Sequence, residues 1–239
     1  MTDGPIRILC VSAHPDDIEF GCAGSIAKWV EGGAVATYCI VTDGSTGTPD
    51  PDLAGSKLAE IRRTESLEAA KAVGVSDVRF LGYRDGYLEY TLDLRRDLAR
   101  VFRDVRPHRM ITMPPDHIAS DMFINHPDHR AVAAASLDLV VTAGTTPGHF
   151  PELLAEELEP WRGLKEVYLM GPGAEGHAED ISDTIDRKIA ALLCHTSQVG
   201  EWDVETAIRG WTAGIGQAHG YAHAESFRVI RPFGAPSDD

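Results

Sequence analysis

Cysteine, basic side chains and long apolar runs are all scarce in this sequence. Its 239 residues include four cysteines, and no two of them form a Cys-x-x-Cys pair, so a cysteine-based structural zinc site is not indicated. Cys10 and Cys39 fall in apolar segments, where a free thiol behaves as a small hydrophobic side chain. We therefore expect these cysteines to contribute to packing and not to chemistry.

The shortage of basic residues excludes two classes of partner. Lysine and arginine number 22 against 37 acidic residues, which gives a net charge of −15. Nucleic acids and anionic membranes are both bound through Lys and Arg, so neither is expected as a partner. The sequence also lacks an apolar run near the roughly 18 residues of a membrane-spanning helix, and its first residues do not show the charged, apolar and small segments expected of a signal peptide. These absences predict a cytoplasmic protein.

The residues that are present predict a single α/β domain over residues 1–239. Apolar segments typical of strands alternate with helical segments: strands over 6–12, 34–42, 78–81 and 109–113, and helices over 24–32, 55–73 and 92–105. This alternation is typical of a parallel sheet with helices on both faces. We therefore predict a Rossmann-like three-layer sandwich with a mostly parallel central sheet. Beyond residue 143 the pattern weakens, and it indicates only a strand over 166–170, a helix over 185–193 and a strand over 227–230.

A polar motif follows the first predicted strand. Ala13-His14-Pro15-Asp16-Asp17 stands at the carboxyl end of that strand, where open α/β sheets bind ligands. His14 and Asp17 are close enough in sequence to bind one divalent ion together. Asp16 would then remain free to act as a base.

A second motif of the same kind lies more than a hundred residues later. Asn125-His126-Pro127-Asp128-His129 opens an Ala-rich helical run, with Pro and Asp well placed for a first helical turn. His126 and His129 are three residues apart, so a helical turn projects them to the same side. Both motifs lie between a strand and a helix of the predicted parallel sheet. We therefore expect them to meet at the same edge of that sheet.

The two motifs together predict a catalytic metal site. His14, Asp17 and His129 supply the ligand set of a catalytic Zn²⁺ that keeps an open position for water. Such a metal lowers the pKa of its water to about 7 and polarises a carbonyl group. Asp16 would accept the proton of that water, and His126 would protonate a leaving nitrogen or stabilise the oxyanion.

Asp128 is a candidate to hydrogen-bond one of these imidazoles and fix its orientation.

Two other interpretations of the motifs remain open. Asp and His residues near helix starts often act as caps, which would make either motif structural. Two His and one carboxylate also describe the facial triad of non-haem iron oxygenases, so Fe²⁺ or another divalent metal is an alternative to zinc.

The paired motifs resemble the PIG-L (LmbE-like) family of zinc-dependent de-N-acetylases, and the resemblance extends to Ala224-Glu225-Ser226-Phe227. It implies a hydrolase that removes an N-acetyl or similar acyl group from an N-acetylglucosamine-type conjugate, with the residues above in the same roles. Arg62 resembles the family's substrate-contacting arginine, and Asp85 resembles a contact to a substrate hydroxyl. The alternatives are a helix-surface arginine paired with a glutamate, and an ordinary turn aspartate.

The sequence departs from the family pattern at two positions. Ile18 stands where many members carry a Glu, and Ile124 stands where some carry a Tyr, so a tyrosine that assists the oxyanion would come from elsewhere. The segments 114–124 and 144–164 are expected to shape the pocket. Related proteins often form closed oligomers, which makes a homo-oligomer an expectation by analogy.

Two other functions compete with this one. A metal-dependent amidase that cleaves a thiol conjugate or another N-acyl amine would use an identical site. A nucleotide-binding Rossmann protein is disfavoured, because the first strand leads into His-Pro-Asp-Asp where a phosphate-binding loop would carry Gly-x-Gly-x-x-Gly.

Overall fold

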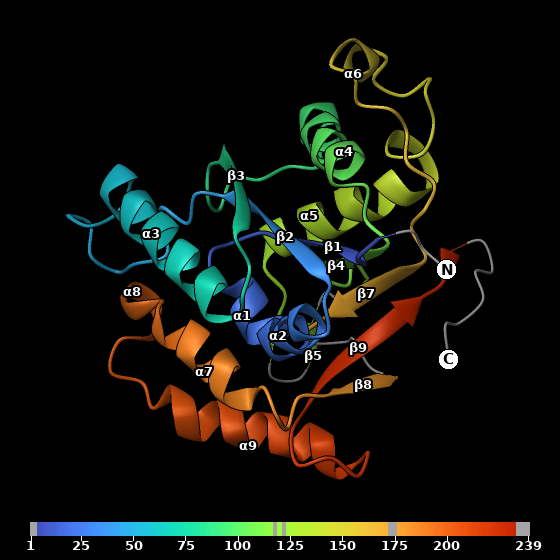
Figure 1. Cartoon of the computed structure of the whole chain (residues 1–239). Helices are drawn as coiled ribbons and strands as arrows, with labels where there is room; N and C mark the ends of the chain where they lie inside the picture. The colour runs from blue at the N-terminus through green and yellow to red at the C-terminus, as the bar shows by residue number, and fades with distance from the viewer. Residues whose placement is uncertain (1–3, 117–118, 121–122, 172–175, 233–239) are drawn as a thin grey trace.

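A seven-stranded sheet runs through the middle of the molecule, in the strand order β3-β2-β1-β4-β7-β9-β8 (Figure 1). The computed structural model describes residues 4–116, 119–120, 123–171 and 176–232. The strands of this sheet are β1 (Arg7–Ser12), β2 (Val35–Thr42), β3 (Asp77–Tyr83), β4 (Arg109–Thr112), β7 (Glu166–Met170), β8 (His177–Asp180) and β9 (Ala224–Ile230). Strands β1, β2, β3, β4 and β7 are parallel, whereas β9 is antiparallel to both of its neighbours. The sheet is therefore mostly parallel, as predicted.

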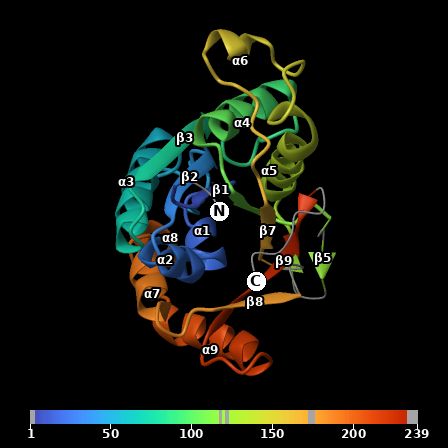
Figure 2. The ribbon, with the colours of Figure 1, turned by 45° about the vertical axis from the view of Figure 1, so that its right-hand side comes forward.

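Helices cover both faces of the sheet and give the predicted three layers (Figure 2). On one face lie α4 (Leu92–Val105) and α5 (Pro127–Asp138), which continues into the π-helix η1 (Leu139–Ala143). On the other lie α2 (Ala23–Glu31), α3 (Ser56–Ala72) and α7 (Ile185–Leu193), and α9 (Val204–Gln217) packs against α7 and β9. The shorter elements are α1 (Asp17–Gly21), α6 (Glu152–Ala155), α8 (Thr196–Val199) and the hairpin of β5 (Ala119–Ser120) and β6 (Phe123–Ile124). None of the described helices is both long and apolar enough to traverse a lipid bilayer.

The central strands form because helices cover them on both sides. Ile8, Leu9 and Val11 of β1 are fully buried, although successive side chains point to opposite faces of the sheet. A strand of this kind appears in the sequence as a continuous apolar run, which is the signal that predicts it. Cys10 and Cys39 are buried free thiols in β1 and β2, in agreement with the expected packing role.

The sequence pattern does not predict helix α9 or strand β8. Helix α9 contains Gly210, Gly214 and Gly216, and a glycine in a helix interior costs about 1 kcal/mol relative to alanine. Its residues Val204 and Ile208 are buried in a small apolar cluster shared with α7. Tertiary packing therefore stabilises a helix that its local propensity disfavours.

The carboxyl ends of the parallel strands meet at one edge of the sheet. The register pairs Ser12 of β1 with Ile40 of β2, and Thr42 of β2 with Tyr83 of β3. The loops that follow these strands therefore lie side by side, and the chain after β4 returns to the same edge before α5. Within the segment 114–124, which is expected to shape the pocket, residues 117–118 and 121–122 lie outside the described residues.

Candidate metal centre

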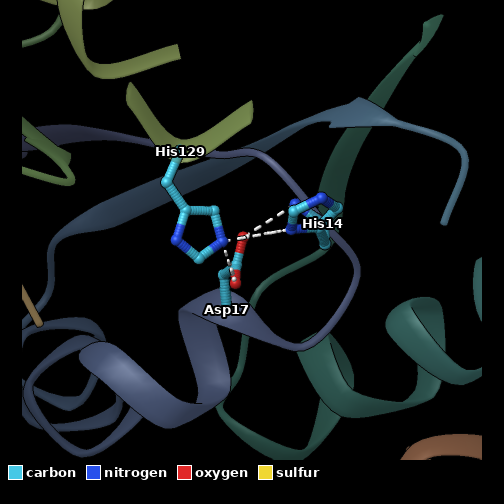
Figure 3. Close-up of side chains that lie close together, drawn as sticks. All are labelled: His14, Asp17 and His129. Atoms are coloured by element: carbon cyan, nitrogen blue, oxygen red, sulfur yellow. Dashed lines mark hydrogen bonds and ion pairs between the residues drawn. The ribbon is translucent and has the colours of Figure 1, made fainter. Parts of the chain in front are cut away.

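Three side chains from two distant parts of the chain converge at this edge of the sheet (Figure 3). His14 lies in the loop after β1, Asp17 begins α1, and His129 lies in the first turn of α5. The Nδ1 atom of His14 is 3.1 Å from Nε2 of His129 and 3.5 Å from Oδ2 of Asp17. The Nε2 atom of His129 is 3.1 Å from Oδ1 of Asp17. The two motifs therefore meet in one small volume.

The donor atoms of this cluster fit a tetrahedral metal ion. With metal–ligand bonds of about 2.0–2.1 Å, tetrahedral geometry separates the ligand atoms by about 3.3 Å, close to the 3.1 Å between the two imidazole nitrogens. One carboxylate oxygen of Asp17 lies within 4.8 Å of both nitrogens. The Nδ1–H group of His129 donates a hydrogen bond to Oδ1 of Asn125 at 3.0 Å, which leaves Nε2 with a lone pair. His14, Asp17 and His129 can thus hold an ion of the catalytic zinc type.

Two carboxylates hold the other ring nitrogen of His14. Its Nε2 atom lies 3.3 Å from Oδ2 of Asp128 and 3.1 Å from Oδ1 of Asp85. Asp128 is in turn fixed by the backbone N–H groups of Gly86 and Leu88, which donate to its carboxylate. Asp128 therefore lies where an orienting carboxylate is predicted, and Asp85 lies beside it against the same imidazole.

Negative charge surrounds His14. Burial alone lowers the pKa of His14, but hydrogen bonds to Asp128, Asp17 and Asp85 raise it to about 12. Burial works in the opposite direction at Asp17, yet His129 and His14 hold the pKa of its carboxyl well below its usual range. The carboxylates of Asp17, Asp85 and Asp128 favour a positive charge near His14. A divalent cation would supply this charge, and its binding would displace the extra proton of His14.

Asp16 stands between two of these residues in the sequence but contacts a different partner. Its Oδ2 atom accepts a hydrogen bond from Nη2 of Arg62 at 3.2 Å. The backbone of Asp16 has a φ of 105°, a left-handed conformation that non-glycine residues keep mainly at functional sites. Burial raises the pKa of Asp16 to about 7, against the lowering effect of the Arg62 guanidinium. A carboxyl group with this pKa can accept and return a proton near neutral pH.

Arg62 is a buried residue that contacts protein groups. Its side chain is 3 % exposed and, besides Asp16, it donates to the carbonyl oxygens of Pro15 at 2.5 Å and Gly44 at 3.1 Å. The alternative of an exposed arginine paired with a glutamate is therefore wrong. The contacts of Arg62 and Asp85 with substrate stay predictions, since the structure shows these residues fixing Asp16 and His14.

His126 is the N-cap residue of α5, and its side chain is more exposed than those of the two ligand histidines, at 42 %. Its Nδ1 atom accepts a hydrogen bond from the backbone N–H of Asp128 at 3.3 Å, so the neutral ring carries its proton on Nε2. Burial and the positive charge of His14 lower the pKa of His126, which favours this neutral form. The ring thus offers a hydrogen-bond donor, and the geometry favours oxyanion stabilisation over proton donation.

A buried lysine that no motif reveals supports helix α1. The Nζ atom of Lys188 donates to the carbonyl oxygens of Glu19 at 2.9 Å and Phe20 at 2.7 Å, and to Oε1 of Glu225 at 2.6 Å. The side chains of Lys188 and Glu225 are 2 % and 3 % exposed. Lys188 therefore satisfies the carbonyl groups at the end of the helix that carries Asp17.

Comparison with known proteins assigns the chain to a family. Residues 9–140 match the family described as "PIG-L: GlcNAc-PI de-N-acetylase". This segment contains both motifs and more than half of the sequence. The chain belongs to the PIG-L family.

Named deacetylases are among the proteins similar to this PIG-L chain. The diacetylchitobiose deacetylase of Thermococcus kodakarensis is 31% identical over 227 residues, which cover 94% of this chain and 83% of the relative. The 1D-myo-inositol 2-acetamido-2-deoxy-alpha-D-glucopyranoside deacetylase of Kineococcus radiotolerans is 28% identical, over 99% of this chain and 81% of the relative. The structure of the N,N'-diacetylchitobiose deacetylase from Pyrococcus horikoshii matches with a TM-score of 0.85 and 30% identity, over 95% of this chain and 87% of that one. The similarity therefore extends well beyond residues 9–140.

Proposed function

We propose that this PIG-L protein is a zinc-dependent hydrolase that removes an N-acetyl, or similar acyl, group from an N-acetylglucosamine-type conjugate. The observation that carries the proposal is the convergence of His14, Asp17 and His129 next to Asp16. The similar proteins named above are deacetylases whose names describe N-acetylated amino-sugar compounds. Family membership and side-chain geometry support the same class of reaction.

Zinc is the proposed metal, and Fe²⁺ or another divalent cation is the alternative. When bound, such an ion lowers the pKa of a coordinated water and polarises an amide carbonyl. Asp128 and Asp85 hold His14 through Nε2, which keeps Nδ1 available as a ligand atom.

The remaining residues of the site account for the proton transfers. Asp16, fixed by Arg62, accepts the proton of the attacking water and returns it to the leaving nitrogen. The Nε2–H group of His126 donates a hydrogen bond to the carbonyl oxygen as that oxygen gains negative charge. The carbon–nitrogen bond then breaks, and a carboxylate and a free amine are released.

The test combines metal analysis with product analysis. Purified protein is assayed for zinc by elemental analysis, and for acetate and free amine from N,N'-diacetylchitobiose and other N-acetylglucosamine conjugates. We expect one metal ion per chain, and acetate release that a chelator abolishes and zinc restores. Full activity of Asp16→Asn would remove Asp16 as the base. Release of an amine without acetate, from a thiol conjugate or another N-acyl amine, would support the alternative amidase function.

Several broader properties stay predictions. We propose that residues 1–239 form one deacetylase domain and that the protein acts in the cytoplasm on a small-molecule conjugate, with neither nucleic acid nor a membrane as partner. Association into a homo-oligomer is also proposed, and light scattering of the purified protein measures it directly.

A further inference from the structure

A cavity of about 610 Å³ adjoins the ligand cluster. It meets the candidate metal centre through Asp17 and His129. More than half of its other lining residues are apolar, and they come from α1, α9, the start of β9 and the carboxyl-end region of β4 and β7: Phe20, Met113, Pro114, Met170, Ile208, Trp211, Ile215 and Ala224. The cavity volume is about twenty times the roughly 30 Å³ that one water molecule occupies in the liquid. It therefore has room for far more than the methyl group of an acetyl substituent.

Four polar side chains of the cavity wall are engaged within the protein. Lys188 and Glu225 form the buried ion pair described above, and Asn125 is hydrogen-bonded to a ligand histidine. Thr212 donates from Oγ1 to the carbonyl oxygen of Ile208 at 2.8 Å. A bound sugar ring needs several polar partners, whereas an apolar group gains about 25 cal/mol for each Å² that it buries. Apart from Ser226 and the ligand residues Asp17 and His129, the described part of this wall therefore suits an apolar group.

The position of the cavity decides which half of an amide substrate enters it. The leaving nitrogen receives its proton from Asp16, so the amine half has to lie beside that residue. Asp16 does not belong to the described lining of the cavity, which touches the metal centre at Asp17 and His129. The acyl half of the substrate is therefore directed into the cavity.

We propose that this cavity is an acyl-chain subsite, and that the protein hydrolyses N-acyl amino sugars whose acyl group is an alkyl chain longer than acetyl. The proposal rests on the hydrolase function above. Water adds to the amide carbonyl, the carbon–nitrogen bond breaks, the nitrogen gains a proton, and the products are a fatty carboxylate and an amino sugar.

Three exposed aromatic rings lie along the cavity: Phe20 and Trp211 line it, and Trp202 packs against both. Phe20, Trp202 and Trp211 are 36 %, 41 % and 59 % exposed. The ring centroids are 6.1 Å apart between Phe20 and Trp202, and 5.7 Å apart between Trp202 and Trp211. A chain that outgrows the cavity would continue along these rings.

A chain-length series with the zinc-loaded protein tests the subsite. Glucosamine release is measured from N-acetyl-, N-butanoyl-, N-hexanoyl- and N-octanoylglucosamine. Each buried CH₂ group contributes up to about fourfold, so we expect kcat/KM to rise at least about tenfold from acetyl to octanoyl. A flat or falling series, with acetyl still hydrolysed, overturns the subsite and leaves the hydrolase function intact. Failure to hydrolyse any member overturns the hydrolase function and, with it, this proposal.

Two variants connect the preference to the cavity. Ile215→Trp fills the cavity from α9, and we expect the ratio of octanoyl to acetyl kcat/KM to fall to about one. The matched control is Val141→Trp, at a position in η1 that is 61 % exposed and does not line the cavity, and this variant keeps the wild-type ratio. An unchanged ratio in Ile215→Trp overturns the assignment of the preference to this cavity.

A binding measurement separates the subsite from turnover. In Asp16→Asn, we expect N-octanoylglucosamine to change the tryptophan fluorescence more than N-acetylglucosamine does, because Trp211 lines the cavity. Most of the change is expected to be lost when Trp211→Phe is added, with Trp202 remaining as the neighbouring tryptophan. Equal responses to the two probes would contradict the proposal.

Discussion

The two halves of this molecule contribute to the site in different ways. The part up to α5 supplies the candidate metal ligands and Asp16 from two short motifs. The part from β7 onward supplies the Lys188–Glu225 ion pair, which contacts α1, and the residues of α9 that line the cavity. His14 and Asp17 are neighbours in sequence, whereas Lys188 contacts the carbonyl group of Glu19 across 169 residues. The difference indicates that short motifs supply the candidate metal ligands, and that long-range packing supplies their support and part of the wall of the adjoining cavity.

The largest effect is expected in the first half, from Asp16→Asn. Asparagine keeps the size of the side chain and tolerates the left-handed backbone, but it cannot act as the base. We expect kcat to fall by about 10²–10⁴-fold with the metal content unchanged, measured by steady-state kinetics and elemental analysis. The control is Asp183→Asn, at an exposed position before α7, which should leave both quantities unchanged. Loss of metal in parallel with activity would instead make Asp16 a ligand.

The second half is tested by Lys188→Met. The substitution leaves the buried carboxylate of Glu225 without its cation and two carbonyl groups of α1 without a donor. We expect the free energy of unfolding to fall by about 3–5 kcal/mol in urea denaturation. The double variant Lys188→Met/Glu225→Gln should recover part of this loss, because the unpaired charge is then removed. If Lys188→Met were as stable as the wild type, the second half would not support α1 in the way described.

A smaller effect is expected from Asn125→Ala, which removes the hydrogen-bond acceptor of His129. Such orienting partners are typically worth about 10–100-fold in metal affinity, and competition with a chelator measures this loss. Asn125→Asp keeps an oxygen acceptor and should restore most of the affinity. Equal affinities for all three proteins would show that Asn125 does not orient the ring.

The smallest effect is expected from Ile208→Val, which shortens one side chain in the cluster between α7 and α9. Ile208 is 1 % exposed, and removing one buried methylene costs about 0.5–1.5 kcal/mol of stability. The matched control is Ile61→Val in α3, where the side chain is 36 % exposed and a change within about 0.5 kcal/mol is expected. Equal losses in the two variants would mean that α9 is not held by this cluster.

The same contrast explains what the sequence can predict. Strands β1, β2 and β4 and helices α3 and α4 follow from continuous apolar runs and helical periodicity, and the motifs place His14, Asp17 and His129 together. Helix α9 is not predicted because its glycines weaken the helical signal and only packing against α7 stabilises it.

Individual residues of the site show where the sequence signal ends. Asn125 could have been found, because it opens the second motif and lies four residues before the ligand His129. Lys188 could not, because its partners Glu19 and Glu225 lie far away in sequence and only the folded chain brings them into contact. Arg62 is named by resemblance alone, and its burial against Asp16 follows from tertiary packing.

The central claim is that one ion joins the loop after β1 to the start of α5. Zinc-edge X-ray absorption of the metal-loaded protein, combined with metal content, tests it most directly. We expect one zinc per chain with nitrogen and oxygen ligands at about 2.0–2.1 Å, and loss of stoichiometric zinc in His129→Ala. A sulfur ligand at about 2.3 Å, or full zinc content in His129→Ala, would contradict it.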